Sequence, residues 1–85
     1  MTEGLTPKLL SAAYAGGYRV RLHFADGVEA VVDLKDELWG EVFEPLRDPS
    51  RFREFRITEG NSTIEWPNGA DLAPESLYER ACAAR

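Results

Sequence analysis

The sequence predicts a small α+β protein, in which an antiparallel sheet made of two hairpins plus a first strand is covered by two or three short helices. Three observations predict this class. Two pairs of adjacent segments alternate apolar and polar residues, which is the period of half-buried strands. A turn sequence that contains glycine joins the two members of each pair. A helical pattern that starts with proline follows each pair, at Pro49 and at Pro74.

The first strand and the first hairpin occupy the N-terminal half of the chain. The strand is expected over Lys8–Tyr14, and the hairpin joins Tyr18–Phe24 to Val28–Leu34. A three-residue loop, Ala25–Gly27, is predicted because it places Phe24 opposite Val28. Both residues are apolar, so the two strands bury the same face. The glycine of this loop then supplies the left-handed residue of a type I turn with a G1 bulge.

The same register brings opposite charges together on the outer face of the hairpin. It opposes Arg19 to Asp33 and His23 to Glu29, and we expect an exposed cross-strand pair at each position. His23 is the single histidine of the sequence. A metal site would need two or three further ligands at a suitable spacing, so His23 is expected to be a surface residue.

The segment between the hairpins is expected to cover one end of the core. A short helical turn is predicted over Asp36–Trp39 and is ended by Gly40. Trp39, Phe43 and Leu46 are the apolar residues that would then cap the core.

Two further helices are expected to begin at prolines. Asp48 offers an N-cap oxygen before a helix over Pro49–Arg53, which would bury Phe52. The last helix is expected over Pro74–Ala83. Its inner stripe consists of Leu77, Tyr78 and Ala81.

The second hairpin is predicted from the same parity argument. It opposes Ile57 to Ile64 and Arg56 to Glu65, so its loop must contain an even number of residues. A two-residue type II′ turn at Gly60-Asn61 meets this condition, because glycine comes first. Pro67 then ends the hydrogen-bond ladder of the hairpin, because proline has no N–H to donate. The next two residues, Asn68 and Gly69, are expected to make a turn.

Length and composition exclude several classes of protein. Eighty-five residues with 44% hydrophobic and 29% charged residues fit one small domain over residues 1–85. Ten Lys and Arg against fifteen Asp and Glu give a net charge of -5, which makes nucleic acid an unlikely partner because backbone binding needs clustered cations. The sequence has no membrane-spanning run and no signal peptide, and the lone Cys82 cannot form an intrachain disulfide. We therefore expect a cytoplasmic protein without membrane association.

Motifs of enzymatic chemistry are absent from the sequence. It contains no glycine-rich phosphate loop, and no serine or cysteine has a base at motif spacing. The acidic residues between Asp33 and Glu41 are expected to form a solvated face, because a cation site needs oxygens that converge. We therefore expect no enzyme, no catalytic or metal-binding residues and no cofactor.

Several segments of the sequence resemble a bacterial family. The segments are Phe24–Gly27, Val32–Leu34, Phe43–Asp48 with Phe52, and Trp66–Glu75 followed by Leu77-Tyr78. On these motifs the chain is similar, from about Lys8 to Glu79, to the domain of unknown function 2442 family. The resemblance implies a small α+β fold and no established catalytic residues. It also implies relatives with an appended helix-turn-helix, and relatives beside small partner genes in arrangements similar to toxin–antitoxin pairs.

Two groups of residues are candidates for contacts with a partner. The segment Trp66–Asp71 offers an aromatic platform, an amide and a carboxylate, although each of these also has a local role in a turn. An arginine group is the one concentration of cations in the sequence, and it consists of Arg47, Arg51, Arg53 and Arg56. The candidate partner contacts are Trp39, Arg47, Arg51, Arg53, Trp66, Asn68 and Asp71.

The function that we expect is that of a small protein-interaction module, one form of which is the acidic member of a toxin–antitoxin-like pair. It would bind a protein partner of unknown identity through sheet edges or exposed aromatic side chains, and a homodimer is one such arrangement. The alternative is a nucleic-acid-binding regulator that uses the arginine group, whose binding would weaken steeply with salt. An enzyme for a small acidic ligand would need a pocket that holds Trp66, Asn68 and Asp71 together.

Overall fold

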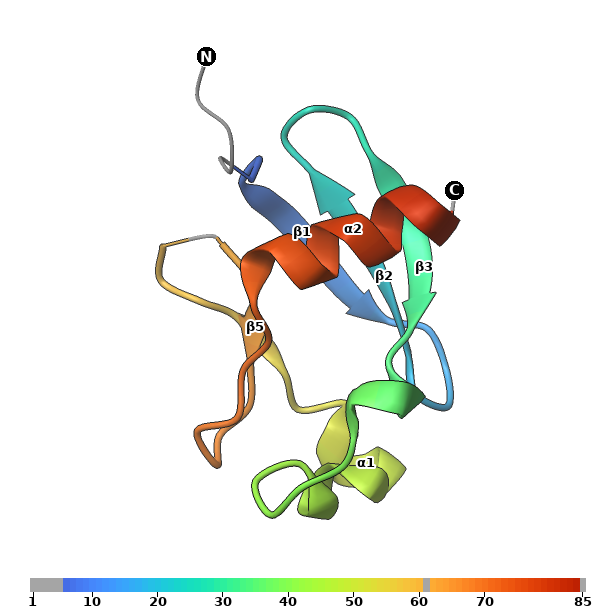
Figure 1. Ribbon diagram of the computed structural model, residues 1–85, viewed down its shortest axis with the longest axis vertical. Coiled ribbons are helices and arrows are strands. Elements are labelled where there is room, and N and C mark those ends of the chain that lie inside the picture. The colour runs from blue at the N-terminus through green and yellow to red at the C-terminus, as the bar shows by residue number, and fades with distance from the viewer. Residues whose placement is uncertain (1–5, 61, 85) are drawn as a thin grey trace.

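Two antiparallel sheets form the fold of residues 6–60 and 62–84, which are the residues that the computed structural model describes (Figure 1). The first sheet has three strands in the order β1-β2-β3, and the second pairs β4 with β5. In chain order the elements are β1 (Leu9–Tyr14), β2 (Arg19–Phe24), β3 (Glu29–Asp33), the 3-10 helices η1 (Lys35–Glu37) and η2 (Glu44–Arg47), α1 (Pro49–Phe52), β4 (Arg56–Ile57), β5 (Ile64–Glu65) and α2 (Pro74–Ala84). The predicted α+β class is confirmed, and the second hairpin forms a sheet of its own.

The first hairpin has the predicted register. The Phe24 N–H donates to the Val28 carbonyl at 2.8 Å, and the Gly27 N–H donates to the Phe24 carbonyl at 3.0 Å. Gly27 has a φ of 95°, the left-handed conformation that a G1 bulge requires. On the inner face Val20, Leu22 and Phe24 are fully buried. The three-residue loop and the face that it buries are therefore confirmed.

The outer face of this hairpin has the predicted register, but neither of the two predicted ion pairs forms. Arg19 opposes Asp33 and His23 opposes Glu29, as expected. The Glu29 carboxylate, however, lies 3.7 Å from the guanidinium of Arg21, its diagonal neighbour, and both side chains are more than half exposed. Diagonal neighbours on a sheet are within reach of long side chains, so the arginine is the cation that meets Glu29.

A β-bulge in β1 decides which of its residues are buried. The pairing with β2 shifts between Leu9 and Ser11, so that Leu10 is an extra residue. Leu9 is fully buried, whereas Leu10 is 54% exposed. Beyond the bulge Ala12 and Tyr14 pack against the core.

Helix α2 lies across the inner face of the three-stranded sheet (Figure 1). Leu77 and Ala81 are fully buried, and Tyr78 is half-buried, so the predicted stripe is confirmed. The Tyr78 ring lies 5.0 Å from the Phe24 ring, edge to face. Its hydroxyl donates to the carboxylate of Asp26 in the hairpin turn, which joins the helix to the tip of the hairpin.

The segment after β3 buries a different residue from the one expected. The helical turn spans Lys35–Glu37 and ends before Trp39, which is 74% exposed. Leu38 is buried in its place. Neighbouring side chains outside a helix point in different directions, so burying Leu38 turns Trp39 outward. The prediction that Trp39 caps the core is therefore wrong, whereas Leu46 is buried and Phe43 is half-buried, as expected.

The second hairpin keeps its predicted pairs but not its predicted turn. Ile57 opposes Ile64 and Arg56 opposes Glu65, with the arginine Nε 2.9 Å from the glutamate Oε2. Gly60 does not have the positive φ that the first central residue of a type II′ turn needs, so that turn is wrong. The other residue of the predicted turn, Asn61, lies outside the described residues.

A third turn repeats the geometry of the first hairpin. The Trp66 N–H donates to the Ala70 carbonyl at 2.8 Å, and the Gly69 N–H donates to the Trp66 carbonyl at 2.9 Å. Gly69 has a φ of 92°. A bridge between Glu65 and Asp71 continues this pairing, so the chain after the turn lies along β5. The predicted asparagine-glycine turn is confirmed and closes a short third hairpin.

Candidate functional site

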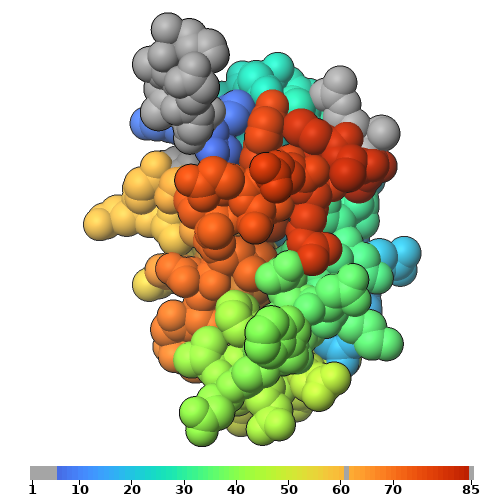
Figure 2. All heavy atoms as spheres, viewed as in Figure 1, coloured from blue at the N-terminus to red at the C-terminus, as the bar shows by residue number. Residues whose placement is uncertain are grey.

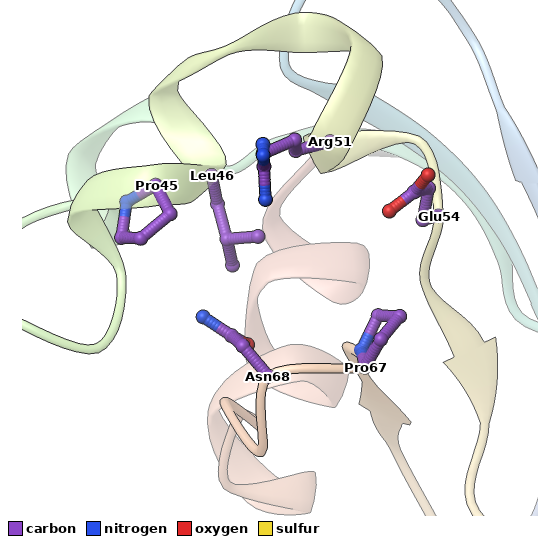
Figure 3. A pocket seen from close by; sticks show the side chains of 6 residues that line it. All are labelled: Pro45, Leu46, Arg51, Glu54, Pro67 and Asn68. Atoms are coloured by element: carbon purple, nitrogen blue, oxygen red, sulfur yellow. The ribbon is translucent and has the colours of Figure 1, made fainter.

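A surface pocket of about 310 Å³ lies between η2, α1 and the turn that follows β5 (Figure 3). Its lining residues are Pro45, Leu46, Arg51, Glu54, Pro67 and Asn68. Two predicted contact residues, Arg51 and Asn68, therefore share one pocket although they come from separate segments of the chain. In the space-filling view the segment between β3 and β4 forms the lower end of the molecule, and the turn lies against it (Figure 2).

One wall of the pocket is built by the cap of α1. The Asp48 carboxylate accepts the Ser50 N–H at 3.0 Å and the Ser50 hydroxyl at 2.9 Å, and Pro49 is the first helical residue. These hydrogen bonds lower the pKa of Asp48 below its ordinary value. The predicted helix start is thus confirmed. Successive helical residues point about 100° apart, so Phe52 is buried while Arg51 is exposed on the pocket side.

The opposite wall is held in place by the side chain of Asn68. Its Oδ1 accepts the Ala70 N–H at 3.1 Å, as an Asx turn does. Its Nδ2 donates to the Val42 carbonyl at 2.8 Å, across 26 positions of sequence. These two bonds fix the orientation of the amide and join the turn to the loop before η2.

Trp66 lies behind this turn, in the core. It is 2% exposed, and its Nε1 donates to the Phe52 carbonyl at 2.7 Å. Its ring packs against those of Phe43, Phe52 and Phe55, with centroids 5.8–6.4 Å apart. The buried ring is not accessible to a partner in this conformation. The prediction that Trp66 is a contact residue is therefore replaced by a structural role in the core. Its indole N–H explains the burial, because tryptophan is buried where that group finds an acceptor.

The charged groups of the pocket form no ion pair with other described residues, although the positive charge of Arg51 helps to lower the pKa of the nearby Asp48 carboxyl. The ion pairs found in residues 6–60 and 62–84 are Arg21–Glu29, Arg56–Glu65 and Arg80–Glu37, and none of them includes a pocket residue. In Figure 3 the guanidinium of Arg51 extends into the space between the walls, and the carboxylate of Glu54 lies beside that space. The pocket therefore presents one cation and one anion to solvent.

The other predicted contact residues are spread around this end of the molecule. Trp39 is on the loop that precedes η2, and Val42 on the same loop is 47% exposed. The guanidinium of Arg53 lies 5.0 Å from the centre of the Tyr14 ring, a cation–π contact. Arg47 and Asp71 are exposed and line neither pocket wall.

Outside the pocket, Tyr78 interacts with both Asp26 and Cys82, and the part of the chain that the structure describes offers no metal site. No three His, Cys, Asp or Glu side chains of that part lie close enough together to hold a metal ion. None of its helices has the length and apolar composition needed to cross a bilayer. Cys82 is exposed, and its thiol is not part of a disulfide. The hydrogen bond to the Asp26 carboxylate raises the pKa of Tyr78 above its ordinary value.

Sequence reasoning missed four of the six lining residues. The sequence predicts Leu46 only as a core residue and Pro67 as the end of the strand ladder within the candidate segment Trp66–Asp71, and it assigns no role to Pro45. Glu54 appeared as one of the acids between the arginines. No periodicity marks these residues, because the pocket depends on the contact between Asn68 and Val42, two irregular segments that are distant in sequence.

The fold and the pocket define a class: a small α+β domain with a surface pocket and, among its described residues, no group of His, Cys, Asp or Glu side chains that could hold a metal ion. Comparison with known families identifies it further. The chain belongs to the DUF2442 family, described as proteins of unknown function, and the match covers residues 9–82. All six pocket residues lie inside that range. No curated protein and no solved structure matches the chain.

Proposed function

We propose that this chain is a small cytoplasmic protein-interaction module that binds its partner through the loop before η2 and the adjoining pocket. The observation that carries the proposal is the exposure of Trp39, at 74%, on a loop that is otherwise anchored. Tryptophan is the residue type most enriched in the energetic centres of protein interfaces. Four large hydrophobic side chains are exposed among the described residues, and two of them, Trp39 and Val42, belong to this loop.

Several contacts hold this loop in one conformation. Leu38 is buried, the Gly40 carbonyl accepts the N–H groups of Phe43 and Glu44, and the Val42 carbonyl accepts the Asn68 amide. A partner that covers an aromatic residue on an anchored loop loses less conformational entropy than one that must first order the loop. Covering about 150–200 Å² of indole would contribute about 4–5 kcal/mol before the costs of association.

The net charge of -5 supports a cationic partner, and the acidic member of a toxin–antitoxin-like pair is the specific form of this proposal. The nucleic-acid alternative is weaker, because two members of the arginine group are already engaged. Arg53 stacks on Tyr14, and Arg56 is paired with Glu65. The remaining cations, Arg47 and Arg51, are too few for a continuous phosphate-binding track.

Affinity purification of the tagged chain from its native cell tests the proposal. The Trp39→Ser variant removes the exposed indole, and Leu10→Ser is the matched control, because Leu10 is exposed on β1 in the other part of the molecule. We expect a stoichiometric protein partner with the wild type and with Leu10→Ser, and its loss with Trp39→Ser. Equal capture by all three, or a partnerless monomer by light scattering, would contradict the proposal; retention of nucleic acid alone would favour the alternative.

A further inference from the structure

Two hydrogen-bond donors face the pocket from opposite walls. The Arg51 guanidinium extends into it from α1, and no ion pair of the described residues uses that guanidinium (Figure 3). Asn68 lies across from it, and its Nδ2 carries two hydrogens, of which the Val42 carbonyl takes one. The second hydrogen remains available. Two such donors are suited to a carboxylate, which accepts several hydrogen bonds at once.

The rest of the lining limits what can carry that carboxylate. The exposed rings of Pro45 and Pro67 form apolar sides, which favour an aliphatic group, whereas the buried Leu46 adds little surface. Glu54 adds an unpaired carboxylate at the edge of the same space. It disfavours a multiply charged anion such as phosphate, and it offers an acceptor to an N–H group of the ligand.

The C-terminal residue of a polypeptide carries these three features on one carbon atom. Its carboxylate, its amide N–H and its side chain all radiate from the terminal Cα. The carboxylate of an aspartate or glutamate side chain extends away from the backbone N–H and brings no separate aliphatic group. A volume of about 310 Å³ is at the small end of ligand pockets and is suited to a single residue.

We propose that the pocket binds the C-terminal residue of an extended protein chain, with its carboxylate on Arg51 and Asn68, its aliphatic side chain against the rings of Pro45 and Pro67, and its N–H toward Glu54. This inference rests on the proposed function and names the part of the partner that the module recognises. The loop with Trp39 would then contact residues that precede the partner's C-terminus. Capture of a C-terminal carboxylate is a known mode of peptide recognition, in which backbone N–H groups often supply the donors that Arg51 and Asn68 would supply here.

Titration of the ¹⁵N-labelled full chain with N-acetyl-L-leucine, followed by NMR, tests the proposal. We expect amide shifts concentrated at Arg51, Glu54 and Asn68. The Arg51→Gln variant should bind at least about fivefold more weakly, because it loses a charge-assisted hydrogen bond. Arg47→Gln is the matched control, since Arg47 is a neighbouring exposed arginine outside the pocket, and it should bind as the wild type does.

Three further ligands separate the possible outcomes. N-acetyl-L-leucinamide lacks the carboxylate, acetate lacks the aliphatic group, and N-acetyl-aspartate N-methylamide places the carboxylate on a side chain. Binding of any of these as tight as that of N-acetyl-L-leucine, or an undiminished affinity of Arg51→Gln, would overturn the proposal. Trp39→Ser should leave this titration unchanged, so a failure of the pocket proposal is measured separately from a failure of partner capture.

Discussion

Replacing Asn68 with alanine is expected to separate the two walls of the pocket and to lower the stability of the protein. The variant loses the acceptor for the Ala70 N–H, which is partly buried, and the donor to the Val42 carbonyl, which is exposed. We assign about 1 kcal/mol to the first bond and about 0.5 kcal/mol to the second, in line with measured net values. The sum of about 1.5 kcal/mol corresponds to a fall in Tm of about 6–12 °C for a domain of this size.

Thermal unfolding followed by circular dichroism measures this change, with two comparison variants. Asn68→Asp keeps the acceptor for Ala70 and loses the donor to Val42, so its Tm should lie between those of the wild type and Asn68→Ala. Glu41→Ala alters an exposed residue of the connected loop and should stay within about 0.5 kcal/mol of the wild type. Equal Tm values for Asn68→Ala and Glu41→Ala would show that the Asn68 amide does not hold the two walls together.

Three further substitutions test the hydrogen bonds that Trp66, Asp48 and Tyr78 make. Trp66→Phe leaves the Phe52 carbonyl without its buried donor, so the free energy of unfolding measured by urea titration should fall by about 2–4 kcal/mol. An unchanged free energy of unfolding would contradict a structural role for Trp66. Asp48→Ala should lower Tm at neutral pH. Because the folded-state pKa of Asp48 is depressed, its contribution is present above the ordinary pKa of 3.8 and is lost as pH falls through the folded value, so the two proteins should converge in acid. Tyr78→Phe should also lower Tm at neutral pH. The folded-state pKa of Tyr78 is raised, so the contribution of its hydroxyl is complete below 10.0 and declines as pH rises further; a difference that grows with alkaline pH would refute the bond to Asp26.

The register of both hairpins followed from the sequence because strand alternation has a period of two. A shift of one residue would have put Phe24 opposite Glu29, so the correct pairing with Val28 was the one that buried a single face. The same logic placed Arg56 against Glu65. Regular periodicity therefore carried most of the strand prediction.

The residues outside regular strands could not be placed in this way. Nothing in the pattern decides whether Leu38 or Trp39 is buried, or that Leu10 is a bulge residue, because either choice leaves an apolar side chain exposed. The type II′ turn at Gly60 is predicted from residue type alone. Several other loop conformations also place Ile57 opposite Ile64.

One missed feature did have a signal in the sequence. The segments Phe24–Val28 and Trp66–Ala70 both consist of an aromatic residue, two turn residues of which the second is Asp or Asn, a glycine and an aliphatic residue. Their hydrogen bonds are equivalent, down to the side-chain oxygen of Asp26 or Asn68 that accepts the N–H two residues later. Comparison of the two segments would have predicted the third hairpin, and with it the position of Asn68.

Arg51 and Asn68 are proposed to form one site for a carboxylate between η2, α1 and the turn after β5. A crystal structure of the protein with N-acetyl-L-leucine would show whether both residues bind the ligand. We expect a carboxylate oxygen at about 2.7–3.2 Å from the Arg51 guanidinium and from the Asn68 Nδ2, with the leucine side chain against the rings of Pro45 and Pro67. A structure in which the ligand binds elsewhere, or in which Asn68 has released Val42 and the pocket has closed, would contradict it.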